Sequence, residues 1–202
     1  MPALGGLLLL SALLSTERVY TAVPERRWLK DNIVGISYVC PYRGSISMVV
    51  SQYNNKTEER VWDFACKSTF QSHVSCSWTD YVNRFDEGIN FSCPSEALIC
   101  GVENLRGTIQ KDRKYSNLLS PSVGPSTGRA SWWRFYCCEA GHVCLRGCAW
   151  SPYINQRNEY FSWEVPADHY LAGIVRHHGN QSGERRWQFR YCAMFSTNIF
   201  AP

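Results

Sequence analysis

Short apolar runs bounded by Pro, Gly, Asn and Ser recur along this 202-residue chain, and no stretch carries a long helical period with caps. Side chains two residues apart share one face of a strand. Three segments place aromatic or cysteine side chains at this spacing: Trp62/Phe64/Cys66, Trp133/Phe135/Cys137 and Trp187/Phe189/Tyr191. The pattern predicts β-strands rich in aromatic and β-branched residues.

These strands end three copies of a longer repeat. Each copy has an aromatic residue, a Cys-Pro or Val-Pro step, an aliphatic run, a polar loop and an aromatic strand. The copies span about residues 28–66, 81–138 and 158–192. Each is expected to form one unit of antiparallel strands, and a unit of this size cannot bury its apolar face alone. We therefore predict an all-β, pseudo-threefold domain over residues 23–202, resembling a prism or a trefoil.

The start of the chain indicates its compartment. The apolar run from Leu4 to Leu14 is too short to cross a bilayer and is typical of a secretory signal peptide within residues 1–22, cleaved between Ser15 and Ala22. Ten Cys in such a chain predict a secreted protein of the extracellular space or matrix with most cysteines oxidised. A net charge of +4 permits an acidic partner. Neither a membrane span nor a nucleic-acid partner is expected.

Three Asn-x-Ser/Thr sequons begin at Asn55, Asn90 and Asn180, and all three are candidate glycosylation sites. Asn55 and Asn180 fall at matching positions in the loops before the aromatic strands of repeats one and three. Asn90 leads directly into a strand.

Motifs for catalysis or metal binding are weak. Cys144-x-x-x-Cys148 is a poor zinc site in an oxidising compartment without a paired His motif. Gly124 to Gly128 has the spacing of a nucleophile elbow, but its flanks are a Ser/Pro-rich loop and a Trp-rich strand. The sequence predicts a protein that is not an enzyme and has no metal or cofactor.

The repeated phrases resemble the dermatopontin family, whose signature is a repeated Asp-Arg-x-Trp-x-aromatic-x-Cys strand. The resemblance covers roughly Trp28 to Met194 and includes the Cys137-Cys138 doublet. Glu replaces the family's Asp at Glu59 and Glu184, and repeat two lacks the acid-Arg pair. The Tyr- and Asp-rich N-terminal segment of vertebrate dermatopontin is also missing, so the chain is more similar to the haemagglutinin and amebocyte-aggregation-factor members.

The resemblance and the repeat together suggest disulfides. The repeat pairs Cys40 with Cys66, and the family pattern agrees. Strict repeat symmetry gives Cys93–Cys137, whereas the family pattern gives Cys76–Cys137 and Cys93–Cys138, and we follow the family. The resemblance also implies Cys148–Cys192. Elimination leaves Cys100–Cys144, with two free thiols as the alternative.

Charged residues in the repeats have two interpretations. The Glu59-Arg60 pair precedes Trp62, and the Glu184-Arg185 pair precedes Trp187. No such pair precedes Trp133. They are either structural ion pairs stacked near aromatics, which we favour, or pockets for an anionic ligand. Three arginines alternate with core aromatics and are expected to form a basic outer face with two histidines: Arg134, Arg186, Arg190, His177 and His178. The alternative basic surface is the Lys111–Lys114 loop.

Two functions follow from these observations. The first is a matrix or cell-adhesion protein that binds sulfated glycosaminoglycans or proteoglycans, as the resemblance implies. The second is a lectin-like agglutination or defence factor that binds specific glycans. Matrix proteins, cell-surface glycans and a second copy of the chain are further expected partners.

Overall fold

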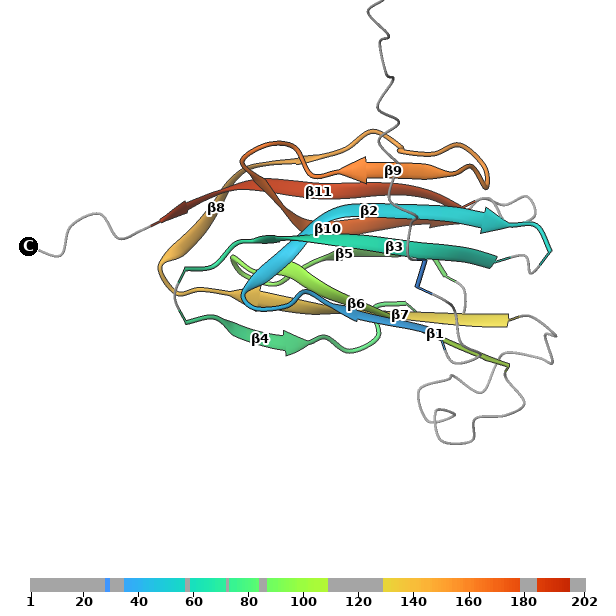
Figure 1. Cartoon of the computed structure of the whole chain (residues 1–202), viewed down its shortest axis with the longest axis horizontal. Coiled ribbons are helices and arrows are strands. Elements are labelled where there is room, and N and C mark those ends of the chain that lie inside the picture. The colour runs from blue at the N-terminus through green and yellow to red at the C-terminus, as the bar shows by residue number, and fades with distance from the viewer. Residues whose placement is uncertain are drawn as a thin grey trace, which may run out of the picture.

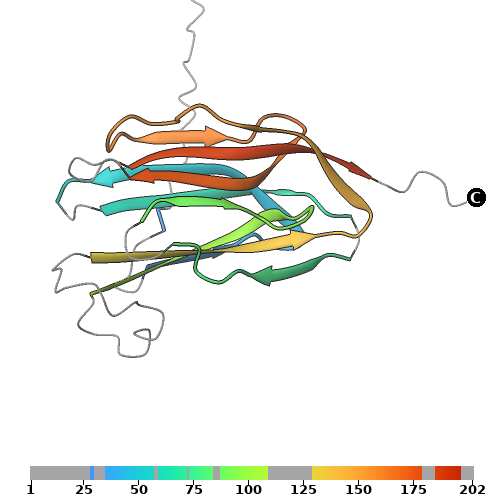
Figure 2. The same ribbon diagram turned by 180° about the vertical axis from the view of Figure 1, so that it is seen from behind.

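The protein is all-β, as the sequence predicts. A computed structural model describes residues 28–29, 35–56, 59–71, 73–83, 87–108, 129–178 and 185–196. Within these ranges it contains eleven antiparallel strands and no helix, so none of them holds a helix long and apolar enough to cross a membrane. The strands run along the long axis of the molecule (Figures 1 and 2). They are β1 (Gly35–Val39), β2 (Gly44–Asn54), β3 (Glu59–Ser68), β4 (Ser75–Trp78), β5 (Ile89–Ser92), β6 (Leu98–Thr108), β7 (Arg129–Glu139), β8 (Val143–Trp150), β9 (Phe161–Glu164), β10 (His169–His178) and β11 (Arg185–Ser196).

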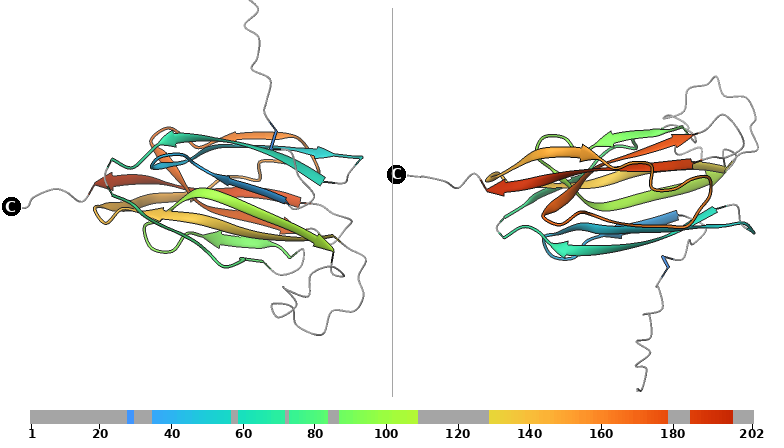
Figure 3. Two further views of the ribbon diagram at one scale, coloured as in Figure 1. Left: turned by 60° about the horizontal axis from the view of Figure 1, so that its bottom comes forward. Right: turned by 90° about the horizontal axis from the view of Figure 1, so that it is seen from above.

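The strands form three twisted sheets around a common interior (Figure 3). Sheet one has the order β3-β2-β9, sheet two β1-β6-β7-β4 and sheet three β5-β10-β11-β8. Each sheet contains a long antiparallel pair of one aliphatic and one aromatic strand: β2–β3, β6–β7 and β10–β11. The three sheets therefore repeat one arrangement of corresponding strands.

The first strand of each repeat does not pair within its own repeat, which differs from the self-contained unit expected from the sequence. β1 pairs with β6, β5 with β10, and β9 with β2. Glycine permits two of these contacts. A Cβ on Gly101 would lie 2.8 Å from the Tyr38 carbonyl oxygen, and one on Gly173 would lie 2.7 Å from that of Phe91. Each repeat thus supplies strands to two sheets.

Three tryptophans meet at the centre of the core, one from each aromatic strand. Trp62, Trp133 and Trp187 are 1–3% exposed and pack edge to face, with ring centroids 5.0 to 5.6 Å apart. Such pairs contribute about 0.5–1.5 kcal/mol each beyond the area they bury. Phe64, Phe135 and Phe189 extend the same buried cluster. The Trp at the centre of each repeated phrase therefore joins the three sheets.

A segment ahead of the first strand of each repeat is hydrogen-bonded to the outer edge of the aromatic strand of that repeat. The backbone N–H groups of Leu29, Val82 and Ile154 donate to the carbonyls of Trp62, Trp133 and Trp187 at 2.8–3.0 Å. In two of the segments, a buried asparagine adds side-chain hydrogen bonds. Asn83 Oδ1 accepts from the Trp133 N–H, and Asn155 Oδ1 accepts from the Trp187 N–H.

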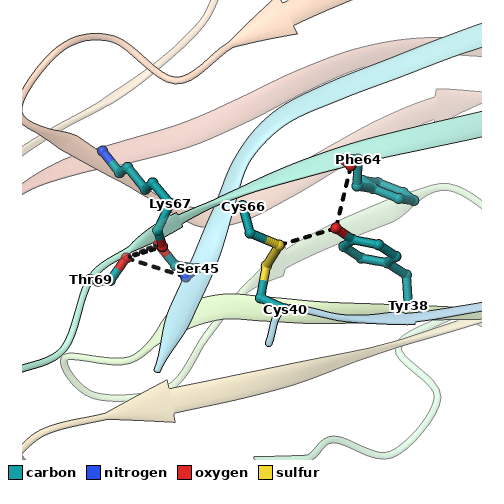
Figure 4. Close-up of a disulfide and its surroundings, with 7 residues drawn as sticks. All are labelled: Tyr38, Cys40, Ser45, Phe64, Cys66, Lys67 and Thr69. Atoms are coloured by element: carbon teal, nitrogen blue, oxygen red, sulfur yellow. Dashed lines mark hydrogen bonds between the residues drawn. A yellow bond between two sulfur atoms is a disulfide. The ribbon is translucent and has the colours of Figure 1, made fainter. Parts of the chain in front are cut away.

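The disulfide Cys40–Cys66 is present, as the repeat predicts. It ties the end of β1 to β3 and so links sheets two and one (Figure 4). The Tyr38 hydroxyl donates to the Phe64 carbonyl at 3.3 Å and lies 3.2 Å from Cys66 Sγ. Nearby, the Ser45 and Thr69 hydroxyls are hydrogen-bonded at 2.7 Å.

The family-based pairing of the doublet is wrong for this chain. The structure contains Cys93–Cys137 and Cys76–Cys138. Neighbouring residues of a strand face opposite ways, and Cys137 points into the main core with Cys93, whereas Cys138 belongs to a second apolar cluster that includes Cys76. Strict repeat symmetry gave the correct partner for Cys93. The expected Cys148–Cys192 bridge is present.

Cys100 and Cys144 are free thiols, so the bridge inferred by elimination is wrong. Cys100 is 2% exposed in the second cluster, and burial raises the pKa of its thiol to about 12. Val143 and Leu145 pack against that cluster from β8. Because strand residues alternate, Cys144 between them faces away from it.

Candidate functional site

A groove of about 600 Å³ lies on sheet three, and all four strands of that sheet contribute to its lining. Asn90 on β5 is opposite Val175 on β10, which is opposite Gln188 on β11. These residues alternate with the core residues Ile89, Ile174 and Phe189. The groove therefore opens on the face of the sheet that points away from the core.

The groove combines an aromatic surface with amide groups. Trp150, at the end of β8, lines the groove and is 40% exposed. Asn90 is exposed, and Gln188 Nε2 donates to the Ser151 carbonyl at 2.9 Å, which orients that amide. No Asp or Glu belongs to the lining formed by the described residues. An exposed indole beside hydrogen-bonding amides suits a ligand with both apolar and hydroxyl-bearing faces.

A basic cluster borders the groove. The Arg186 guanidinium lies 4.2 Å from the centroid of the Tyr153 ring, and the same ring packs edge to face on His177 at 5.3 Å. His177 itself lines the groove, and Arg190 is paired opposite Trp150. Three of the five residues expected on a basic face thus lie on the same face of sheet three: Arg186 and His177 around Tyr153, and Arg190 further along β11. The side chain of His178 lies outside the described residues.

Arg134 does not join this cluster, contrary to the sequence-based expectation. It lies on β7 in sheet two, where its Nε and Nη2 donate to the two carboxylate oxygens of Glu103 at 2.7 and 3.1 Å. Its guanidinium lies over Trp78 at 4.9 Å, and the Tyr81 hydroxyl also donates to Glu103. Its charge is neutralised by a bidentate ion pair.

The strand registers explain why sheet three has an exposed Trp and sheet two a half-buried one. Trp78 and Trp150 occupy matching positions before the edge segments of sheets two and three. Val175 stands where sheet two has Glu103, and Gln188 stands where it has Arg134. Sheet three therefore lacks the ion pair that covers Trp78.

Arg60 is a buried residue packed near an aromatic ring, while its ion pair with Glu59 stays a prediction. It is 3% exposed, its Nη1 donates to Ser51 Oγ, and its Nη2 donates to the Glu159 carbonyl at 2.8 Å. Its guanidinium also packs over Phe161. Burial, with a further effect of Arg185, lowers the pKa of Arg60 to about 10. The side chain of Glu59 and the whole of Glu184 lie outside the described residues.

The candidate glycosylation sites differ in their surroundings. Asn55 is exposed in the turn between β2 and β3, and Asn90 is exposed on β5 at the groove. Asn180, the Lys111–Lys114 loop and residues 1–22 lie outside the described ranges. Within those ranges, no group of three His, Cys, Asp or Glu side chains could hold a metal ion.

Comparison with known proteins identifies the family. The sequence profile of dermatopontin matches residues 16–118 and 127–197. The chain belongs to the dermatopontin family. It is 30% identical over 169 residues to a hemagglutinin/amebocyte aggregation factor of Limulus polyphemus, covering 83% of this chain and 87% of that protein.

Two further members of the dermatopontin family are similar to the chain. It is 27% identical to a dermatopontin of Biomphalaria glabrata, over 77% of this chain and 92% of the relative. It is 24% identical to Homo sapiens dermatopontin, over 83% and 77% respectively. No solved structure matches significantly.

The family signature and the repeated aromatic phrase did not lead to the groove. Trp150 and Tyr153 belong to a different recurring phrase, Trp-x-x-Tyr-x-Asn, at residues 78–83 and 150–155. That phrase was the available signal for the edge segments. It could not show which copy leaves its Trp exposed, because the covering residues come from other strands.

Proposed function

We propose that this dermatopontin-family chain is a secreted, non-enzymatic matrix or cell-adhesion protein that binds acidic saccharides in the groove of sheet three. One observation carries the proposal: an exposed Trp150 lies in a groove with amide side chains, a basic border and no lining carboxylate among the described residues. The ligand class is a sulfated or carboxylated glycan, such as a glycosaminoglycan chain of a proteoglycan.

Each part of the groove suits one feature of such a glycan. The apolar face of a sugar ring can lie against the indole of Trp150, and the amides of Asn90 and Gln188 can exchange hydrogen bonds with hydroxyls. Arginine forms bidentate contacts with oxyanions, so Arg186 and Arg190 suit sulfate or carboxylate groups along the chain. Binding then weakens with salt, because salt screens the attraction between solvent-exposed arginines and the anionic groups of the glycan.

Family membership supports an extracellular adhesion role. One relative carries the name hemagglutinin/amebocyte aggregation factor, and others are dermatopontins. Four disulfides in the structure also suit an oxidising compartment. Agglutination needs at least two binding sites per particle, so a chain with one groove would bridge cells or matrix as an oligomer or through a second surface.

The second candidate is a lectin-like agglutination or defence factor that recognises neutral or sialylated sugars. The exposed Trp150 with its flanking amides favours it, because these groups need no charge on the ligand. The two candidates differ in the contribution of Arg186 and Arg190, and hence in their dependence on salt.

A glycan array read at low and at higher salt tests the proposal. The array compares the unaltered chain with a Ser92→Ala variant. The variant lacks the sequon at Asn90 but keeps every lining residue of the groove. Binding confined to sulfated or carboxylated glycans, weakened by salt and lost with Trp150→Ala, is the expected result. Salt-resistant binding to neutral sugars would favour the lectin-like candidate.

Trp78→Ala in the same Ser92→Ala background is the matched control, because Trp78 is the corresponding residue beneath Arg134 in sheet two. It should leave glycan binding unchanged. Binding that survives Trp150→Ala would contradict the groove as the site.

A further inference from the structure

One of the three sequons lies inside the candidate groove. Asn90 lines it, is exposed, and is followed by Phe91 and Ser92, which complete the acceptor sequence Asn-Phe-Ser. Phe91 points the other way and stacks on Phe135 with ring centroids 4.7 Å apart, so the strand fixes which way Asn90 faces. A glycan on Asn90 would therefore begin within the groove.

We propose that Asn90 is N-glycosylated and that the first N-acetylglucosamine residues of its glycan lie along the groove against Trp150. The glycosylated chain is then closed to an external saccharide, and the unglycosylated chain is open. This proposal rests on the proposed function to the extent that the groove has to accept a sugar.

The order of strands directs the attached glycan across the sheet. β5 is the edge strand of sheet three, and β10, β11 and β8 follow it towards Trp150. Neighbouring strands are about 5 Å apart, so roughly 15 Å of groove separates the two edges. The side chains on this path are Val175 and Gln188. A short oligosaccharide that starts at Asn90 reaches the indole by following the floor of the groove.

The groove chemistry also suits this particular sugar. N-acetylglucosamine is uncharged, and it carries hydroxyls and an amide that can pair with the Gln188 amide and the His177 ring. Its ring has an apolar face for Trp150. Because the sugar is covalently attached, its effective concentration at the groove is in the millimolar range typical of short tethers, so a weak contact suffices for occupancy.

Asn55 provides a contrast within the same chain. It is exposed in the turn between β2 and β3, and it does not line the groove. A glycan there is expected to be fully solvated. Its release from the folded protein thus serves as an internal reference for the glycan at Asn90.

The first test measures site occupancy and release on the folded protein. Peptide mapping of chain secreted from a eukaryotic host should find a glycan on Asn90. An endoglycosidase acting on the native protein should release it about tenfold more slowly than after Trp150→Ala, if the docked form is about 90% populated. Trp150→Phe should give an intermediate rate, and release from Asn55 should not change. An unmodified Asn90, or release that is independent of residue 150, would overturn the proposal.

The second test separates this inference from the proposed function. Ser92→Ala removes the sequon and leaves Asn90 in place, whereas Ser92→Thr keeps the sequon. The alanine variant should bind array glycans about tenfold or more tightly than the unaltered chain and the threonine variant. Equal binding by all three proteins would contradict the proposal that the Asn90 glycan closes the groove. The groove would then still be a saccharide site. A third outcome is possible, in which release of the Asn90 glycan depends on Trp150 but the Ser92→Ala variant binds no array glycan. It would contradict the proposed external ligand and support the docking of the chain's own glycan.

Discussion

Arg134 Nε lies 2.7 Å from Glu103 Oε1, and this ion pair covers Trp78 on sheet two. The corresponding position on sheet three has Gln188 and Val175, and there Trp150 is exposed. Two residue differences between equivalent strands therefore accompany the change from a half-buried Trp78 to an exposed Trp150. The proposed binding groove arises from differences between copies of the repeat, while the shared residues form the core.

The first prediction concerns that ion pair. Glu103→Val combined with Arg134→Gln should expose Trp78, because it installs the pair of residues found at the open position of sheet three. The fraction of tryptophan fluorescence quenched by acrylamide should rise. Adding Trp78→Phe should abolish the increase, which controls for the other tryptophans. An unchanged quenchable fraction in the double variant would show that something other than the ion pair covers Trp78.

The second prediction concerns the tryptophans at the centre of the core. Trp62→Ala should lower the free energy of unfolding by about 3–5 kcal/mol, because a buried aromatic ring is deleted and a cavity remains. Trp150→Ala should cost less, about 1–2 kcal/mol, since the groove indole is 40% exposed and leaves no cavity in the core. Denaturant unfolding with the disulfides intact measures both. Similar losses for the two variants would contradict the assignment of Trp62 to the core and Trp150 to the surface.

The third prediction concerns Asn155, whose side chain is hydrogen-bonded to the edge of β11. Asn155 is 3% exposed, accepts from the Trp187 N–H at 3.0 Å and donates to the Arg185 carbonyl at 2.9 Å. Asn155→Ala should destabilise the protein by about 1–3 kcal/mol, because a buried N–H loses its acceptor. The exposed neighbour change Gln156→Ala is the control and should have little effect on the same unfolding curve.

The sequence predicts those features of the fold that depend on residues close together in the chain, and it does not predict those that depend on contacts between distant strands. The alternation of Trp62 and Phe64 predicted a buried face, and the repeat predicted Cys40–Cys66, because both follow from spacing within a strand or a repeat. The transfer of β1 to sheet two was not predicted. All the aliphatic strands offer similar partners, and the choice depends on close contacts such as that of Tyr38 with Gly101.

The groove could not be predicted from the sequence, because it too depends on contacts between distant strands. The alternation around Trp187 correctly placed Arg186 and Arg190 on the outer face. It could not show that Glu103 reaches across from β6 to neutralise Arg134, since that pair depends on the register between strands. A shared phase along a strand does not place residues on a shared surface.

The fourth prediction concerns the two free thiols. Burial raises the pKa of Cys100 to about 12, so its thiol stays protonated at pH 8 and its thiolate forms only near pH 12. Cys144 is half-buried and outside the second cluster. Alkylation of the native protein at pH 8 should therefore modify Cys144 and leave Cys100 intact, and denaturation without reductant should release both. Mass spectrometry that finds no thiol after denaturation would restore the Cys100–Cys144 bridge.

The most direct measurement of the central claim is elution from immobilised heparin, using protein with Ser92→Ala so that the groove is free of its own glycan. The double change of Arg186 and Arg190 to Gln should elute at clearly lower salt, because two cations that border the groove are lost. Arg134→Gln removes a charge that is already paired with Glu103, and it should elute with the parent protein. An unchanged elution salt for the double variant, or an equal shift with Arg134→Gln, would contradict binding of acidic saccharides at the groove of sheet three.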